Sequence, residues 1–598
     1  MHGRTLARAL DNISAQSPTA IRKSEPVTGN SETARYTSTI GNQGKSIPEE
    51  MLYYLTLFVI ISATAYRLFP IVLGQPWLSE FFITEDGYLM LTVARNMAIG
   101  HGLSVSDGTI PTNGVQPLAT FLFSFIYLVC GGDKVSSLVG IILLSTVFSL
   151  AGLFAVRAFA RTALQDQDPN PLWPWLVAAL WYTGPLLLLH TMNGLETGLY
   201  TLTVVASLVW FGHLITLGPR ATLRDQLLLG ALCGITFLAR NDGVFLSIAI
   251  YGAWAIHSIF VVRRGVISTA VRLLPAAIVT LLIAAPWLAN NKINFGSIVP
   301  ISGAAQSIGS HFGQNASLVP VKLFEHLVPV LPIPASFEAR TSVIAISAIV
   351  VTTVLLFFLV GVWRRGGSTR FVIGAYILYG ALLSGYYGFF FGAPHFMSRY
   401  LAPLAPLLIV AAVSVMISFI QSLMPKRTDM ISAILGIGAL LMSSALLVRL
   451  LLPGNHVHEH FQVVRWINSN VPADTWVGAV QTGTLGYWHD RTINLDGKVN
   501  PEALNALRRD GHALNYITAG PIVYLADWVG IASWMQRPEA YFTDAFELVV
   551  SDPAANLAVM RRRPVHSPAS SSNGKTGETD APGASTAGRN TSGSLAPN

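Results

Sequence analysis

The sequence contains few charged residues. Asp, Glu, Lys and Arg make up 12% of its 598 residues, whereas about a quarter of the residues in a typical soluble protein are charged. Hydrophobic residues account for 52%, a balance expected of a chain that is surrounded mostly by lipid. The composition therefore excludes an ordinary soluble enzyme, and it predicts that most of the chain lies in a membrane.

Cysteine and net charge are scarce as well. The two cysteines, Cys130 and Cys233, both lie in apolar runs, which excludes a disulfide framework and a cysteine metal site. The net charge of +7 comes from 38 basic and 31 acidic residues that are scattered along the chain, and this argues against nucleic-acid binding. No Walker loop, nucleotide-binding glycine cluster or internal repeat is present. The positions of the few charges are therefore more informative than their sum.

Twelve apolar runs follow residue 50, and eleven of them are predicted to cross the membrane. The run 117–131 is short for a hydrocarbon core of about 30 Å, so we expect it to lie on the outer surface or to re-enter. The run 226–239 is short as well, but its outer end meets a polar segment that can line a cavity. The predicted spans are 51–73, 136–159, 172–189, 198–217, 226–239, 243–262, 267–288, 342–362, 371–391, 401–421 and 430–451.

Basic residues at the span ends decide the orientation, because cytoplasmic loops carry an excess of Lys and Arg. If 117–131 does not cross, all five basic loops lie on the cytoplasmic side; if it crosses, all five lie outside. The amino terminus is therefore expected inside and the carboxy-terminal region outside. The basic loops contain Arg157 and Arg161, Arg220 and Arg224, Arg263 and Arg264, Arg364, Arg365 and Arg370, and Lys426 and Arg427.

The composition and periodicity of the sequence predict four regions. The segment from about residue 453 has a helix-like stretch at 459–469, a strand-like stretch at 476–481 and turn signals at Gly483, Gly486 and Asp496-Gly497, as in a small α/β domain. The two ends are rich in small polar residues and are expected to be disordered. The regions are a cytoplasmic tail (1–49), a transmembrane module (50–452) with extracytoplasmic loops 74–135 and 289–341, an extracytoplasmic α/β domain (453–565) and a second tail (566–598).

The first external loop places two carboxylates, Glu85 and Asp86, at the start of an amphipathic helix. A carboxylate that is partly desolvated at such a position can act as a general base. The alternative is that Asp86 or Thr84 only caps the helix. Further along this loop, Asn113 and Gln116 either hydrogen-bond a polyol or satisfy the backbone of a turn.

The other external loops carry further candidates, each with a structural alternative. Glu196 is either a ligand or a helix cap. Arg240 either binds an anionic group or forms a neutralising pair with Asp242. Arg399 is a basic residue on the outer side, where few basic residues are expected, and this suggests a phosphate partner. Lys292 is a weaker candidate for the same role, because it can be an interfacial lysine.

The string His456-Val-His-Glu-His460 matches the H-x-x-E-H zinc-peptidase pattern. It has no third ligand, and it follows Pro453-Gly454 at the exit of a span. Short motifs of this kind match by chance, so an exposed linker is favoured.

Several of these loop motifs together resemble those of GT-C class integral-membrane glycosyltransferases. The similarity is nearest to bacterial polyprenyl-phosphate-sugar enzymes of the mycobacterial arabinofuranosyltransferase type and to RgtA/B/C/D-like domains, and it runs from about residue 50 to 530. The motifs are Glu85-Asp86-Gly-Tyr88, Ala94-Arg-Asn-Met97, Thr112-Asn-Gly-Val-Gln116-Pro-Leu, Asn193-Gly-Leu-Glu196-Thr, Leu238-Ala-Arg240-Asn-Asp242-Gly, Pro286-Trp287 through Phe295-Gly-Ser-Ile-Val-Pro300, Ser398-Arg399-Tyr400, and Gly486-Tyr487 through Asn494-Leu-Asp-Gly-Lys-Val-Asn500.

The resemblance implies an inverting transfer from a polyprenyl-phosphate sugar to a hydroxyl of an extracytoplasmic glycan or lipid. It implies that a first-loop acid is the base, and the order Glu-Asp leaves this role between Asp86 and Glu85. The donor phosphate is then expected at Arg240, Arg399, Lys292 and His395. The substrates are expected at Asn113, Gln116, Glu196, Asp242 and Tyr88.

The expected enzyme is a hexosyl- or pentosyltransferase of the bacterial inner membrane, with its site facing the periplasm or exterior. Its expected fold is a polytopic α-helical membrane protein of GT-C type with about eleven transmembrane helices and a small extracytoplasmic α/β domain. The cofactor stays open, with a divalent cation as one option. The alternative function is a transporter or flippase of lipid-linked saccharides, which predicts ionisable residues deep in several spans and inverted repeats. A scaffold is a third option, although eleven spans exceed what an anchor needs.

Overall fold

The computed structural model describes residues 47–168, 170–452, 460–532, 534 and 540–564. Almost all of the two predicted tails lies outside these residues. So does the H-x-x-E-H string except for His460, whose buried ring hydrogen-bonds the Gln481 carbonyl at 2.9 Å.

Among the described residues, nine helical segments are long and apolar enough to cross a membrane. Several are continued by short helices, η1 (Gly218–Arg220), η2 (His257–Val261), η5 (Pro425–Arg427), and η3 (Pro394–Phe396), α18 (Met397–Leu401) and η4 (Ala402–Leu404) before α19. The long helices are α2 (Ile47–Leu73), α6 (Lys134–Leu164), α9 (Thr197–Leu217), α11 (Gly243–Ile256), α12 (Val266–Phe295), α16 (Thr341–Arg365), α17 (Thr369–Phe389), α19 (Ala405–Leu423) and α20 (Thr428–Leu450).

The remaining two predicted spans are a bent pair and a short helix. Helices α7 (Leu172–Thr183) and α8 (Pro185–Met192) pass as one span with a bend of 61° at Gly184, which makes ten. Helix α10 (Leu223–Ala239) has 17 residues and is about 26 Å long, at the lower limit for a span. The predicted count of eleven is therefore approximate. Helix α5 (Pro117–Val129), predicted not to cross, has only 13 residues.

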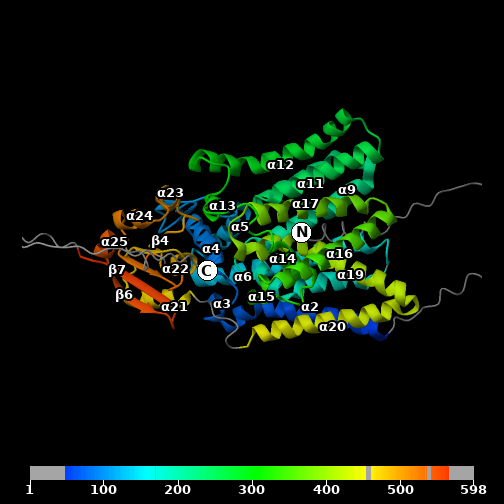
Figure 1. The fold of residues 1–598 in the computed structure, drawn as a ribbon. Coiled ribbons are helices and arrows are strands. Elements are labelled where there is room, and N and C mark those ends of the chain that lie inside the picture. The colour runs from blue at the N-terminus through cyan, green and yellow to red at the C-terminus, as the bar shows by residue number, and fades with distance from the viewer. Residues whose placement is uncertain (1–46, 169, 453–459, 533, 535–539, 565–598) are drawn as a thin grey trace, which may run out of the picture. The chain divides into compact units, whose positions relative to one another are not determined.

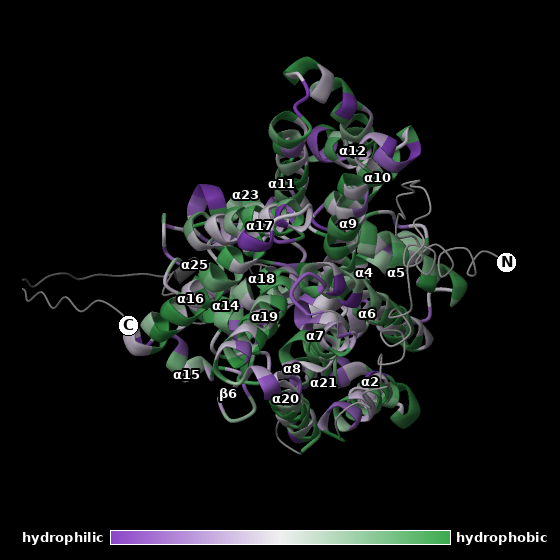
Figure 2. Ribbon diagram, turned by 90° about the vertical axis from the view of Figure 1, so that its right-hand side faces the viewer, coloured by the Kyte–Doolittle hydropathy of each residue, from purple (hydrophilic) through white to green (hydrophobic). Residues whose placement is uncertain are grey.

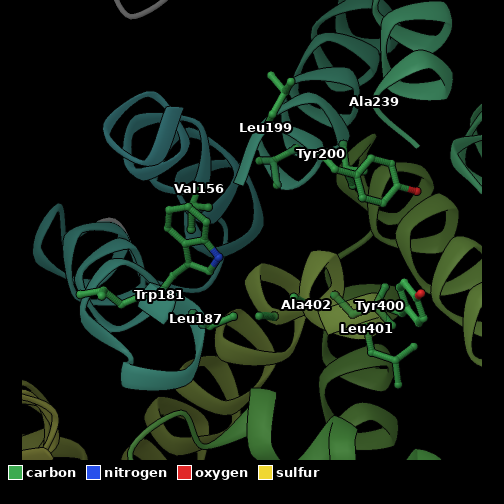
Figure 3. Packing of buried hydrophobic residues seen from close by; sticks show 14 of the residues in the cluster. Val156, Trp181, Leu187, Leu199, Tyr200, Ala239, Tyr400, Leu401 and Ala402 are labelled. Carbon is green, nitrogen blue, oxygen red and sulfur yellow. The ribbon is translucent and has the colours of Figure 1, made fainter. Parts of the chain in front are cut away.

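Apolar side chains face both inwards and outwards in this bundle. In the core, Trp181 of α7 lies between Val156 of α6 and Leu187 of α8, and Leu199 of α9 and Leu401 of α18 continue the cluster (Figure 3). The outer surfaces of α2, α12, α16 and α20 carry exposed large apolar residues, and the view along the helices shows hydrophobic residues on the outside of the bundle (Figure 2). Such a surface is suited to lipid, and the chain is a multi-pass membrane protein.

Short elements occupy the loops at one end of the helices. The first loop contains α3 (Trp77–Glu80), α4 (Glu85–Ala98) and the antiparallel pair β1 (Ser104–Val105) and β2 (Ile110–Pro111). The long loop after α12 contains α13 (Ile301–Gln306), α14 (Val319–Leu327) and α15 (Ala335–Glu338). These loops lie at the end that faces the C-terminal α/β region (Figure 1).

The C-terminal region contains a five-stranded sheet in the order β4-β3-β5-β7-β6. Strand β3 pairs in parallel with β4 and β5, and β7 pairs antiparallel with β5 and β6. Gly483 and Gly486, expected in turns, both lie in the short helix α22. The elements are α21 (Phe461–Asn470), β3 (Val477–Ala479), α22 (Gly483–Trp488), β4 (Thr492–Asn494), α23 (Pro501–Asp510), α24 (Leu514–Ala519), β5 (Tyr524–Asp527), α25 (Ala540–Ala545), β6 (Phe546–Asp552) and β7 (Leu557–Arg562).

The sheet region is joined to the first loop by polar and aromatic contacts. Tyr487 of α22 packs against Tyr88 with ring centroids 4.8 Å apart and accepts a hydrogen bond from Tyr127 at 2.9 Å. Asp490 forms ion pairs with Arg95 at 3.3 Å and with Lys134 at 3.0 Å. These contacts hold α4, and with it the candidate base, between the helix bundle and the sheet.

Candidate active site

A cavity of about 470 Å³ lies where the loops of the bundle meet the C-terminal region. Its charged lining residues come from five segments that are far apart in the sequence. Apolar residues from α4, α10, α11, α12 and α17 and from the loops between the helices form most of the rest of the wall. The charged and amide side chains are Asp86, Gln116, Glu196, Arg240, Asn241, Asp242, Gln306, Arg399 and Lys498.

The start of α4 is built by a cap and a close backbone approach. The hydroxyl of Thr84 accepts a hydrogen bond from Gly87 N at 3.3 Å and so caps the helix. Gly87 lies against the carbonyl of Asn193, where a Cβ would clash. Because Thr84 supplies the cap, the carboxylate of Asp86 is left to face the cavity. The first-loop motif and the Asn193 motif, separate in the sequence, are thus in contact.

Asp86 is paired with two cations from different parts of the chain. Its Oδ2 accepts a hydrogen bond from Nη1 of Arg399 at 3.2 Å, and its Oδ1 lies 3.7 Å from Nζ of Lys498. Burial raises the pKa of the Asp86 carboxyl, but the charges of Lys498 and Arg399 outweigh this effect and bring the pKa below its usual value. Asp86 is therefore ionised at neutral pH.

The neighbouring carboxylate, Glu85, points away from the cavity. It accepts hydrogen bonds from the backbone N–H groups of Gly483 and Thr484 and from the Thr484 hydroxyl, the last at 2.7 Å. These groups form the first turn of α22, where free N–H groups favour a negative charge. Gly483 is required because a Cβ there would clash with the Glu85 carbonyl. Glu85 thus joins the first loop to the C-terminal region.

The segment that carries Arg399 is held in place by side chains of α8 and α14. The ring of His326 hydrogen-bonds the Ser398 carbonyl at 2.8 Å, and His190 lies 3.3 Å from the Ser398 hydroxyl. Burial lowers the pKa of His326 to about 4, so the neutral ring donates its Nε2–H to this carbonyl. Nη2 of Arg399 also reaches the hydroxyl of Tyr400 at 3.3 Å. The guanidinium is thereby directed at Asp86 and the cavity.

Arg240 and Asp242 form a second, fully buried ion pair in the cavity wall. Nη2 of Arg240 lies 2.5 Å from Oδ2 of Asp242, and the hydroxyl of Tyr387 donates to the same oxygen at 2.7 Å. Tyr200 and Tyr400, both seen in Figure 3, flank the guanidinium with ring centroids 4.8 Å away. Among the described residues, Nη1 of Arg240 has no hydrogen-bond partner. The pair is thus neutralising, and it leaves one guanidinium edge for an anion.

Two more predicted substrate residues line the cavity. Gln116 immediately precedes α5, and within the described part of the chain its Oε1 is buried without a partner. Glu196 is 2% exposed and precedes α9, but its side chain makes no capping hydrogen bond. Both side chains are therefore placed to contact a bound molecule.

The other predicted residues do not line the cavity. Asn113 joins two loops through Asn291 and the backbone of Ile301, both at 3.1 Å. Tyr88 is buried and donates to the Ser79 carbonyl at 2.7 Å. These two residues hold the loops together.

Two predicted phosphate ligands are likewise outside the cavity wall. Lys292 is exposed and donates to the Gly296 carbonyl at 3.0 Å, at the end of α12. His395 is exposed and packs on Phe396, with ring centroids 3.9 Å apart. The structure therefore does not bring Lys292 together with Arg240 and Arg399. His395 does not line the cavity either, but it lies close enough to Asp86, Arg399 and Lys498 to interact with their charges.

Several polar lining residues were not predicted from the sequence, among them Lys498, Gln306 and Tyr387. Gln306 accepts a hydrogen bond from the Tyr400 hydroxyl at 3.1 Å. Lys498 follows Asp496-Gly497, where the sequence predicts a turn, and its side chain reaches Asp86 across the interface. The one available signal was a cation inside a motif that resembles the GT-C pattern.

Within the described residues, no group of three or more His, Cys, Asp or Glu side chains is arranged to hold a metal ion.

The architecture is similar to that of several solved membrane proteins. ArnT from Cupriavidus metallidurans bound to undecaprenyl phosphate is similar over 86% of this chain and 97% of its own, with a TM-score of 0.51 and 12% identity. The oligosaccharyltransferase AglB from Archaeoglobus fulgidus, in complex with an inhibitory peptide and a dolichol-phosphate, is similar over 87% of this chain and 76% of its own, with a TM-score of 0.53 and 11% identity. The chain has the GT-C fold.

This GT-C fold agrees with the resemblance seen in the loop motifs. A further structure of the Archaeoglobus fulgidus oligosaccharyltransferase, in complex with Zn and sulfate, is similar over 82% of this chain and 71% of its own, with a TM-score of 0.52 and 12% identity. A family model described as a domain of unknown function (DUF8728) matches residues 453–562. No curated protein matches the chain.

Proposed function

We propose that this protein is an inverting glycosyltransferase. It moves a hexosyl or pentosyl group from a polyprenyl-phosphate donor to a hydroxyl of an extracytoplasmic glycan or lipid, with Asp86 as the general base. Arg240 and Arg399 bind the donor phosphate, and Gln116 and Glu196 contact the sugar or the acceptor.

One observation carries this proposal: a single cavity joins a carboxylate and two arginines to an apolar wall at the edge of the bundle. The wall includes Phe237 of α10, Phe245 of α11 and Leu288 of α12. A lipid-linked sugar phosphate has the same division into an isoprenoid tail and an anionic head. The fold it shares with ArnT and AglB, whose structures contain undecaprenyl phosphate and dolichol-phosphate, supports the same choice of donor.

The residues suit an in-line displacement at the anomeric carbon. Asp86 takes the proton of the acceptor hydroxyl while the oxygen of that hydroxyl bonds to the anomeric carbon. The bond from that carbon to the phosphate oxygen breaks on the opposite side, and the configuration is inverted. The negative charge of the departing polyprenyl phosphate is stabilised by the guanidinium groups of Arg240 and Arg399, since planar guanidinium groups bind phosphate oxygens in pairs.

The choice of Asp86 over Glu85 rests on what each carboxylate contacts. Both oxygens of Glu85 accept hydrogen bonds from the start of α22, so neither is free to accept a proton from a substrate. Asp86 lines the cavity and contacts only cations that a phosphate also attracts.

We further propose that the cavity opens to the outside of a bacterial inner membrane. The basic loops between the spans lie at the opposite ends of the helices from the cavity, and such loops favour the cytoplasmic side. A reporter enzyme fused after Arg563 tests this orientation. Activity of a periplasm-specific reporter is expected, and activity of a cytoplasm-specific reporter would overturn it.

The activity is tested with purified protein, labelled polyprenyl-phosphate sugars and membrane-derived acceptor lipids and glycans. Transfer of label with release of polyprenyl phosphate is expected, and it is expected to be lost in Asp86→Asn and retained in Glu85→Gln. Movement of intact donor across a vesicle membrane without transfer would instead identify a flippase. Full activity of Asp86→Asn would show that another group is the base.

A further inference from the structure

Lys498 is a cation that the C-terminal region contributes to the cavity. It follows β4, and its side chain is 16% exposed. Its Nζ lies 3.2 Å from Oδ2 of Asp496 and 3.7 Å from Oδ1 of Asp86. Because Arg399 contacts the other oxygen of Asp86, the carboxylate lies between a cation of the bundle and a cation of the C-terminal region.

The turn that carries Lys498 is rigid. Gly497 has φ of +78°, a left-handed conformation that favours glycine, and its N–H donates to the side chain of Asn494 at 3.0 Å. The N–H of Lys498 donates to Asp496 at 2.9 Å. The carbonyl of Lys498 lies so close to Gly114 that a Cβ at residue 114 would clash with it. The first loop therefore packs directly on this turn and directs the lysine into the cavity.

Each cation in the cavity wall is paired with an acid, and Arg240 also keeps one guanidinium nitrogen without a partner among the described residues. A phosphate that binds closely to Lys498 and Arg399 competes with the carboxylates that they hold. Arg240 and Asp242 are 2.5 Å apart and buried, and Tyr387 adds a hydrogen bond. Lys498 keeps Asp496 at 3.2 Å. Asp86 holds its two cations at 3.2 and 3.7 Å, in a part of the wall that is open to the cavity. Asp86 is thus the carboxylate that is most easily displaced.

Resting on the proposed function, we infer that Lys498 is a donor-phosphate ligand, and that donor binding draws Lys498 and Arg399 from Asp86 to the phosphate. In the free protein both cations hold the base as an ion pair. In the donor complex they neutralise the phosphate, and the carboxylate becomes the stronger base that the acceptor hydroxyl requires. The C-terminal region is then a component of the active site, and it couples deprotonation of the acceptor to the presence of a donor.

This exchange predicts two different pH dependences. The charged and titratable groups around Asp86 are Arg399, Lys498, His395, Tyr400, Glu85, Glu196 and Asp496. The profile of kcat/KM reports the free enzyme and that of kcat reports the donor complex. Because an opposite charge lowers the pKa of a carboxyl by about 1–3 units, losing two cations to the phosphate moves the acid limb of kcat upward by about one unit or more. The acid limb of kcat/KM is therefore expected at a lower pH than the acid limb of kcat.

Binding of undecaprenyl phosphate to the detergent-solubilised full chain tests the ligand role, with undecaprenol as the neutral probe. Lys498→Met is expected to weaken phosphate binding about tenfold, to leave undecaprenol binding unchanged, and to be rescued in part by Lys498→Arg. Arg491→Ala is the matched control, because Arg491 is also a C-terminal cation on a first-loop acid, 3.6 Å from Asp107, but outside the cavity lining. It is expected to bind like the wild type.

The outcomes separate this inference from the proposed function. No undecaprenyl phosphate binding by the wild type would overturn the proposed function and the inference together. Wild-type binding with equal binding by Lys498→Met would overturn only the ligand role of Lys498.

The pH profiles then test the exchange. In Lys498→Met, the acid limb of kcat/KM is expected to rise toward that of kcat, since one of the two cations has gone from the free enzyme. The exchange would be overturned if the acid limbs of kcat and kcat/KM coincide in the wild type. It would also be overturned if Lys498→Met does not move the acid limb of kcat/KM.

Discussion

The cavity contains two acid–arginine pairs of different construction. Arg240 and Asp242 are two residues apart in sequence, 2.5 Å apart in space and almost completely buried. Asp86 and Arg399 come from loops 313 residues apart, lie 3.2 Å from each other, and are 17% and 11% exposed. A buried pair that loses one partner leaves an uncompensated charge, whereas a pair at a cavity wall can exchange a partner for a ligand. The first pair is therefore built to stay together, and the second to open.

The largest expected effect separates the two acids by activity. Asp86→Asn removes the proposed base while keeping its size, and kcat is expected to fall by about 10²–10⁴-fold. Its melting temperature is expected to stay close to that of the wild type, because its cations remain next to the cavity. Transfer assays and thermal unfolding in detergent measure the two quantities. A large loss of stability with little loss of kcat per folded molecule would show that Asp86 serves the stability of the fold and not the reaction.

The second effect is on stability. Asp242→Asn leaves the buried guanidinium of Arg240 without its carboxylate, and the free energy of unfolding is expected to fall by about 3 kcal/mol. Denaturant unfolding measures the change.

The double variant Arg240→Met with Asp242→Asn serves as the control. It is expected to be more stable than Asp242→Asn alone, because no unpaired charge remains buried. Equal destabilisation of the two variants would show that the unpaired charge of Arg240 is not the cause of the loss of stability.

A smaller effect is expected at Glu85. Glu85→Gln replaces charge-assisted hydrogen bonds to the start of α22 with weaker ones, and we expect a loss of about 1.5–3 kcal/mol in the contact between the first loop and the C-terminal region. Limited proteolysis is expected to cut this region faster, while kcat falls less than tenfold. A loss of kcat as great as that of Asp86→Asn would place Glu85 in the chemistry.

The smallest effect is expected at Lys292. Lys292→Ala removes an exposed side chain whose hydrogen bond is to the Gly296 carbonyl, so transfer is expected to stay within about twofold and stability within about 0.5 kcal/mol. Arg399→Ala is the contrasting variant and is expected to reduce kcat/KM strongly. Similar losses in both would show that cations outside the cavity wall also serve the donor.

The motifs around the site were visible in the sequence, but their partners were not. Because only 12% of the residues are charged, an acid or arginine at the end of an apolar run stands out, and this is how Asp86, Glu196, Arg240 and Arg399 were found. The same reasoning also selected Lys292, whose side chain turns back to the Gly296 carbonyl, because a loop position does not tell which way a side chain points. Sequence order could not decide between Glu85 and Asp86.

By itself, the sequence determined the membrane-embedded helices and the small C-terminal α/β region, because apolar periodicity and charge placement are local properties of the chain. Only the tertiary structure decided which acid faces the cavity, since Thr84 caps α4 and α22 takes the carboxylate of Glu85. It also brought Lys498 to within 3.7 Å of Asp86. Contacts across 412 residues depend on how whole elements pack, and no short pattern records them.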